Sequence, residues 1–129
     1  MEIISLIRLQ PVLSLIDTHA DFLLYRIDSK DQYIYGGLIR LHILHHASKG
    51  PIFGVWFIEE LARHGYKLSP GTLYPLLHGL EQKGYLSSTK EREGKRLRRL
   101  YQATPRGRKA LLAARQKVSE LFGELLEEE

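Results

Sequence analysis

The stretch LSPGTLYPLLHGLEQKGYL, residues 68–86, constrains the fold of this chain more than any other. Its leucines recur at helical spacing, yet two prolines and a glycine follow Ser69 closely. These poor helix formers are tolerated if Ser69 caps the helix, because Pro70 then takes the first helical position, where no N–H is needed. The sequence therefore predicts a helix that begins after Ser69 and stops at Gly84, with its leucines buried.

The hydrophobic period changes directly after this helix. Residues 85–91 and 97–103 have the composition of two short strands, with residues 92–95 as the turn between them. Thr104 then caps a last helix that has Pro105 in its first position and runs toward Glu129.

Two helices are predicted before residue 68. One covers residues 38–48. The next begins with Pro51 in its first turn and continues to about Arg63, with an inner face made of Val55, Ile58, Leu61 and Ala62. Residues 28–37 are predicted to be a linker, and residues 2–27 an apolar arm that is helical in pieces.

The order helix, helix, helix, strand, strand, helix predicts a mainly α fold with a small β wing, that is, a winged helix-turn-helix. We expect three parts. Residues 1–36 form an N-terminal helical extension and linker, residues 37–104 the winged-helix domain, and residues 105–129 a C-terminal helix.

Charge is concentrated in one segment. The chain has a formal net charge of +4, but residues 87–118 alone carry eleven basic and two acidic side chains, a net +9. Residues 119–129 carry five acidic side chains and no basic one. A basic run of this size on a hairpin suits neutralisation of phosphates, although a solvated surface has the same composition.

The outer face of the helix after Ser69 is small, weakly charged and rich in hydrogen-bonding groups. Ser69, Thr72, Tyr74 and His78 lie on it, beside the helix N-terminus. Such a face fits phosphates and base edges in the major groove, whereas the alternative is an ordinary amphipathic helix with a tyrosine at its rim. Lys95, Arg96 and Arg98 would contact the DNA backbone from the wing.

Three segments resemble the PadR family of transcriptional regulators, namely GPIFGVWFIEEL (50–61), LSPGTLYPLLHGLEQKGYL (68–86) and GKRLRRLYQATPRGRKAL (94–111). The resemblance covers about residue 37 to the end and implies a winged-helix DNA-binding domain with a dimerising C-terminal helix. It also implies that Ser69, Thr72 and Tyr74 face DNA, that Lys95 and Arg96 lie at the wing, and that the regulator acts as a repressor. It does not extend to residues 1–36 or to any effector.

The last helix carries a seam spaced as in a coiled coil. The apolar residues of the seam follow each other at intervals of three and four positions: Leu111, Ala114, Val118, Leu121 and Leu125. This spacing predicts a homodimer interface. The alternative is that the stripe packs on its own domain, since two heptads are too short for an independent coiled coil.

Other classes of function find less support. There is no phosphate loop, nucleophile elbow or paired-histidine metal motif, so we expect neither an enzyme nor a cofactor. His42, His45 and His46 share part of a helix face, but no cysteine or nearby carboxylate completes a metal site. We therefore expect no metal, and histidines that face solvent or an interface.

The sequence leads us to expect a dimeric protein that binds a double-stranded operator, and the resemblance to the PadR family implies that it is a repressor. The alternative is an RNA-binding or a non-enzymatic protein-interaction module, and a small-molecule effector is left open. No run approaches the roughly 18 apolar residues of a membrane span, and the first residues lack the basic start of an export signal. A cytoplasmic location without membrane contact is the expectation.

Overall fold

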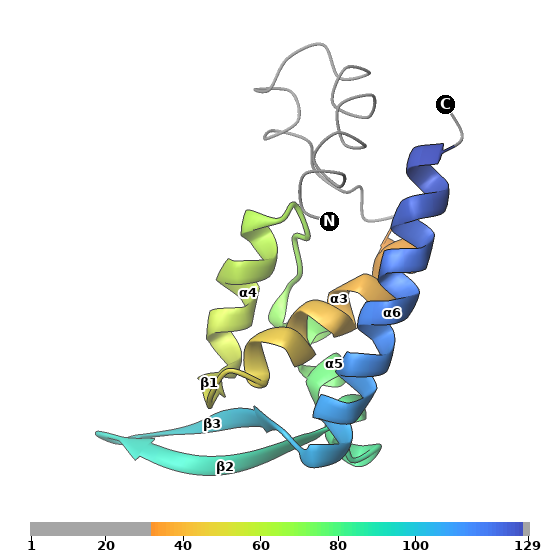
Figure 1. Cartoon of the computed structure of the whole chain (residues 1–129). Helices are drawn as coiled ribbons and strands as arrows, with labels where there is room; N and C mark the ends of the chain where they lie inside the picture. The colour runs from red at the N-terminus through yellow and green to blue at the C-terminus, as the bar shows by residue number, and fades with distance from the viewer. Residues whose placement is uncertain (1–31, 128–129) are drawn as a thin grey trace. The chain divides into compact units, whose positions relative to one another are not determined.

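The computed structural model describes residues 32–127 (Figure 1). The predicted helical arm over residues 2–27 lies outside this range, as do the first residues of the predicted linker. The described chain divides into two units, one that includes residues 32–113 and one that includes residues 114–127.

The first unit contains three helices and a hairpin. Its elements in chain order are α3 (Gln32–Ala47), β1 (Ile52–Phe53), α4 (Gly54–Arg63), α5 (Pro70–Gln82), β2 (Leu86–Glu93) and β3 (Arg96–Ala103). The last helix, α6 (Pro105–Glu127), begins in this unit and continues through residues 114–127. These elements confirm a mainly α fold with a small β wing.

Helix α3 begins earlier than the sequence predicts. It starts at Gln32, so the predicted linker over residues 28–37 is wrong from that residue onward. The helix runs through Gly36 and Gly37, each of which costs about 1 kcal/mol relative to alanine. Packing offsets this cost, because Tyr35 lies against the core with its ring centroid 6.0 Å from that of Tyr66.

The segment after α3 is extended where the sequence predicts helix. Pro51 is not in a helix; Ile52 and Phe53 form β1, which pairs antiparallel with β3 at Tyr101 and Leu100. The sheet therefore has three strands in the order β1-β3-β2. Two residues are too few to show a strand pattern, and the partner strand, distant in sequence, decides their conformation.

The residues that α4 buries also differ from the predicted ones. Phe57 and Leu61 are buried, while Val55 and Ala62 are exposed. The buried face of α4 consists of Gly54, Phe57 and Leu61. Gly54 lies against the side chains of Tyr74 and Tyr101.

The core joins the three helices to the base of the hairpin. Ile39 and Ile43 of α3, Phe57 and Leu61 of α4, and the leucines of α5 pack into one cluster with the ends of β2 and β3. As predicted, Leu73, Leu77 and Leu80 bury the inner side of α5. Its outer side is therefore left for solvent or a partner.

Candidate nucleic-acid interface

The start of α5 is built as the sequence predicts. The Ser69 hydroxyl accepts a hydrogen bond from the backbone N–H of Thr72 at 3.3 Å, and Pro70 is the first helical residue. Gly84, with φ of +84°, follows the C-cap residue Lys83 and ends the helix. The Ser69 side chain, although exposed, thus has a capping role in addition to any contact with a partner.

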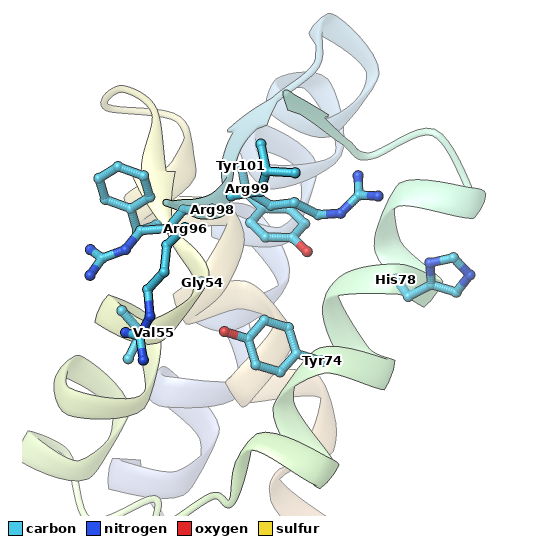
Figure 2. A pocket seen from close by; sticks show the side chains of 10 residues that line it. Gly54, Val55, Tyr74, His78, Arg96, Arg98, Arg99 and Tyr101 are labelled. Carbon is cyan, nitrogen blue, oxygen red and sulfur yellow. The ribbon is translucent and has the colours of Figure 1, made fainter. Parts of the chain in front are cut away.

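The outer face of α5 presents the predicted polar stripe. Thr72, Tyr74 and His78 are all exposed, and Tyr74 keeps 42% of its surface open to solvent. Figure 2 shows the Tyr74 ring reaching from α5 toward Gly54 and Val55 at the start of α4. A Cβ at Gly54 would lie 2.8 Å from Tyr74 Cε1, so the absence of a side chain there allows the ring its position.

The wing is a tight antiparallel hairpin. Glu93 pairs with Arg96, which leaves a two-residue turn of Gly94 and Lys95, shorter than the predicted four-residue turn. Gly94 has φ of +62° and no other turn residue has positive φ, the pattern of a type II′ turn. The turn thereby holds Lys95 and Arg96, both exposed, at the tip.

Arg98 is less accessible than the other wing cations. Its Nη1 lies 3.0 Å from Glu93 Oε2, and its guanidinium carbon is 5.4 Å from the centroid of the Phe53 ring. These contacts hold the guanidinium against the sheet, so any phosphate contact by Arg98 competes with an ion pair.

A hydrogen-bond chain fixes the wing to α5. The Ser88 hydroxyl on β2 donates to Glu81 Oε2 on α5 at 2.5 Å and accepts from Arg99 Nη1 on β3 at 3.1 Å. A helix and both wing strands are thus joined at one serine. Sequence reasoning missed this link, since its three members come from three elements and share no periodic pattern.

A pocket of about 710 Å³ lies between these elements (Figure 2). Its walls are the start of α4, the face of α5 that carries Tyr74 and His78, and residues 96–101 of β3 apart from Leu100. Burial raises the pKa of the Tyr101 hydroxyl in this wall, and the nearby Arg99 opposes that shift. The lining combines two tyrosines, a histidine and three arginines with the apolar Phe53, Val55 and Leu97, and its arginines suit an anionic surface.

The residues predicted for dimerisation differ in exposure along α6. Leu111 is half-buried and packs against the core of its own domain, and Ala114 is half-buried. Val118, Leu121 and Leu125 are exposed, at 43%, 53% and 61%. The first residue of the seam, Leu111, thus packs within its own chain, whereas Val118, Leu121 and Leu125 are open to solvent.

Three packed helices, with the third exposed on its outer face and followed by a β-hairpin, define a winged helix-turn-helix protein. Residues 43–113 match the model of the PadR-like family of transcriptional regulators. The chain belongs to this family.

Individual relatives agree with this assignment. The transcriptional regulator Rv3488 of Mycobacterium tuberculosis is 52% identical over 88 residues, which cover 68% of this chain and 82% of the relative. A PadR family regulator from Eggerthella lenta has a similar crystal structure, with a TM-score of 0.65 and 28% identity over 78% of this chain and 92% of its own. A PadR-like regulator from Bacillus cereus gives a TM-score of 0.62 and 25% identity, over 75% and 99%.

This protein is accordingly a transcriptional regulator and not an enzyme. Within the part of the chain that the structure describes, no helix is both long and apolar enough to cross a membrane.

Proposed function

We propose that the protein binds double-stranded DNA sequence-specifically, as a homodimer, and represses transcription. Helix α5 would enter the major groove while the β2–β3 hairpin follows the phosphate backbone. One observation carries the proposal: Tyr74 and His78 of α5 line the same pocket as Arg96 and Arg98 of the wing. Groups suited to base edges and groups suited to phosphates thus share one surface.

The roles within this surface follow from chemistry and exposure. Thr72, Tyr74 and His78 offer hydrogen-bonding groups that can discriminate between bases, and the N-terminus of α5 favours a phosphate. Lys95 and Arg96 at the tip of the wing would contact phosphates and release counterions. Arg98 would contribute less, because Glu93 already neutralises part of its charge.

A dimer would place two copies of α5 in successive major grooves. One winged helix covers only a short half-site, and a two-fold axis would space two of them about 34–36 Å apart. The exposed Val118, Leu121 and Leu125 supply apolar surface for such an interface. Bound over a promoter, this assembly would act in the cytoplasm by blocking access to the DNA.

The test is a selection from random duplexes with the purified protein, followed by binding measurements on the enriched site. We expect a pseudo-palindromic sequence. Tyr74→Ala and Thr72→Val should each weaken binding to it by about 1–3 kcal/mol, because each removes a group that would bind a base or a phosphate. Binding to a scrambled duplex should change much less. Thr72→Val should barely move the melting temperature, whereas Tyr74→Ala should lower it because the Tyr74 ring packs against Gly54.

Unchanged operator affinity in both variants would show that α5 does not recognise the operator sequence. The selection also separates the alternatives: tighter binding to single-stranded RNA than to any duplex would favour an RNA-binding module. No enrichment of any nucleic acid would favour a protein-interaction module.

A further inference from the structure

A second polar cluster lies where α3 meets the end of α4. His42 and His46 come from α3, and His64 follows directly after α4. One ring nitrogen from each histidine lies within 4.8 Å of the corresponding atoms of the other two. Nothing in the proposed contact with DNA uses these side chains.

The cluster consists of two facing pairs, each at helical spacing. His42 and His46 are four residues apart on one face of α3, and Glu60 and His64 are four residues apart at the end of α4. His45 belongs to neither pair and is exposed. The carboxylate and the third imidazole that the sequence of α3 lacks are thus supplied by a different helix.

The distances approach those of a metal site. Glu60 Oε1 lies 3.4 Å from His46 Nε2 and 3.3 Å from His64 Nε2. Around a tetrahedral ion with bonds of about 2.0–2.1 Å, neighbouring ligand atoms are about 3.3–3.4 Å apart. Two edges of such a tetrahedron are therefore in place. A ring nitrogen of His42 lies within 4.8 Å of those of His46 and His64, so the His42 side chain would have to move closer to complete the set.

The surroundings also suit a cation. The side chains of His46 and Glu60 are only 18% and 13% exposed. The His42 side chain is half-buried as well. The other charged group at the carboxylate is Arg63, whose Nη1 is 3.4 Å from Glu60 Oε2, so Oε1 is the oxygen that faces the histidines.

We propose that His42, His46 and His64, with Glu60 as the fourth ligand, bind one divalent transition-metal ion of the Zn²⁺ class. Imidazole nitrogens select such ions over Mg²⁺ and Ca²⁺, which prefer sites made of oxygen atoms alone. The ion would clip α3 to the end of α4. Because the unfolded chain does not present the four groups together, binding would stabilise the folded domain.

The experiment uses the full chain without a histidine tag, in Zn²⁺ titrations by calorimetry and Co²⁺ titrations by visible absorption. We expect one ion per chain, the intense absorption of four-coordinate Co²⁺, and a melting temperature that rises with Zn²⁺. His64→Ala, His46→Ala and Glu60→Gln should each weaken binding by about 10–100-fold or more. His45→Ala is the matched control, because His45 adjoins His46 on α3, and it should bind as the parent does.

Circular dichroism of the metal-free variants would check that each is folded, which we expect of His64→Ala because the His64 side chain is 46% exposed. Absence of Zn²⁺ binding by the folded parent at micromolar concentration would overturn the proposal. So would equal weakening by His45→Ala, which would indicate adventitious binding to surface histidines. Because these measurements contain no DNA, their outcome is independent of the proposed operator binding.

Discussion

Gly107, in the first turns of α6, lies where no side chain fits. A Cβ at this position would be 2.1 Å from the carbonyl oxygen of Tyr85 and 3.4 Å from a methyl carbon of Leu44. The same carbonyl accepts a hydrogen bond from Thr104 N–H, and the Thr104 hydroxyl accepts one from Gly107 N–H at 3.0 Å. The missing side chain thus lets the start of α6 join the turn between α5 and β2.

Gly107→Ala should therefore destabilise the domain by about 3 kcal/mol, the upper part of the usual range for overpacking, because the obstructing atom belongs to the backbone. Chemical denaturation with helix content as the signal measures this. Gly37→Ala is the control: Gly37 is exposed in α3 with nothing within 4 Å of a Cβ, so alanine there should stabilise by about 1 kcal/mol. Equal effects of the two substitutions would contradict the packing described for Gly107.

At the scale of elements, the relation between α5 and the wing depends on the Glu81–Ser88–Arg99 chain. Ser88→Ala should cost about 1–2 kcal/mol of stability, since half-buried Glu81 loses a hydrogen-bond donor. Operator affinity should fall as well, because the wing is no longer held against α5. Ser87→Ala, the exposed neighbour on the same strand, is the control and should change neither denaturation nor DNA binding.

The sequence predicts an element well when the interactions that define it lie within a few residues of each other. Ser69, Pro70 and Gly84 determine the limits of α5, and Thr104 and Pro105 the start of α6, through bonds within a few residues. These predictions are confirmed. The helix across Gly36 and Gly37, and the strand that replaces the helix predicted from Pro51, depend on packing and pairing with distant segments.

The same distinction applies to the sites. The polar face of α5 follows from its own spacing, and its exposure is confirmed. Gly54 against Tyr74, Ser88 between Glu81 and Arg99, and His64 beside His42 each bring together residues from different elements. Such contacts depend on the tertiary fold and leave no periodic pattern in a single sequence.

For the whole molecule, the first question is assembly. Val118→Glu with Leu121→Glu should convert a dimer into a monomer, because burying two carboxylates at an apolar interface costs several kcal/mol each. Sedimentation should report the change in mass, with near-native helix content and loss of tight operator binding. As a control, Glu120→Gln with Glu124→Gln alters neighbouring acidic positions on the same helix and should leave the mass unchanged.

A double variant that stays dimeric would place the interface elsewhere. A parent chain that is monomeric at micromolar concentration would mean that the seam serves only its own chain.

The proposed interface of α5 and the wing is tested most directly by the salt dependence of operator binding. Lys95→Ala with Arg96→Ala should reduce the slope of log affinity against log salt concentration by about 0.9 for each phosphate that is no longer neutralised, or about 1.8 in total. Arg63→Ala with Lys117→Ala removes the same charge from α4 and α6 and should leave the slope near that of the parent. Equal slopes for the parent and the wing variant would contradict this interface, since the exposed cations at the tip of the hairpin would then not touch DNA.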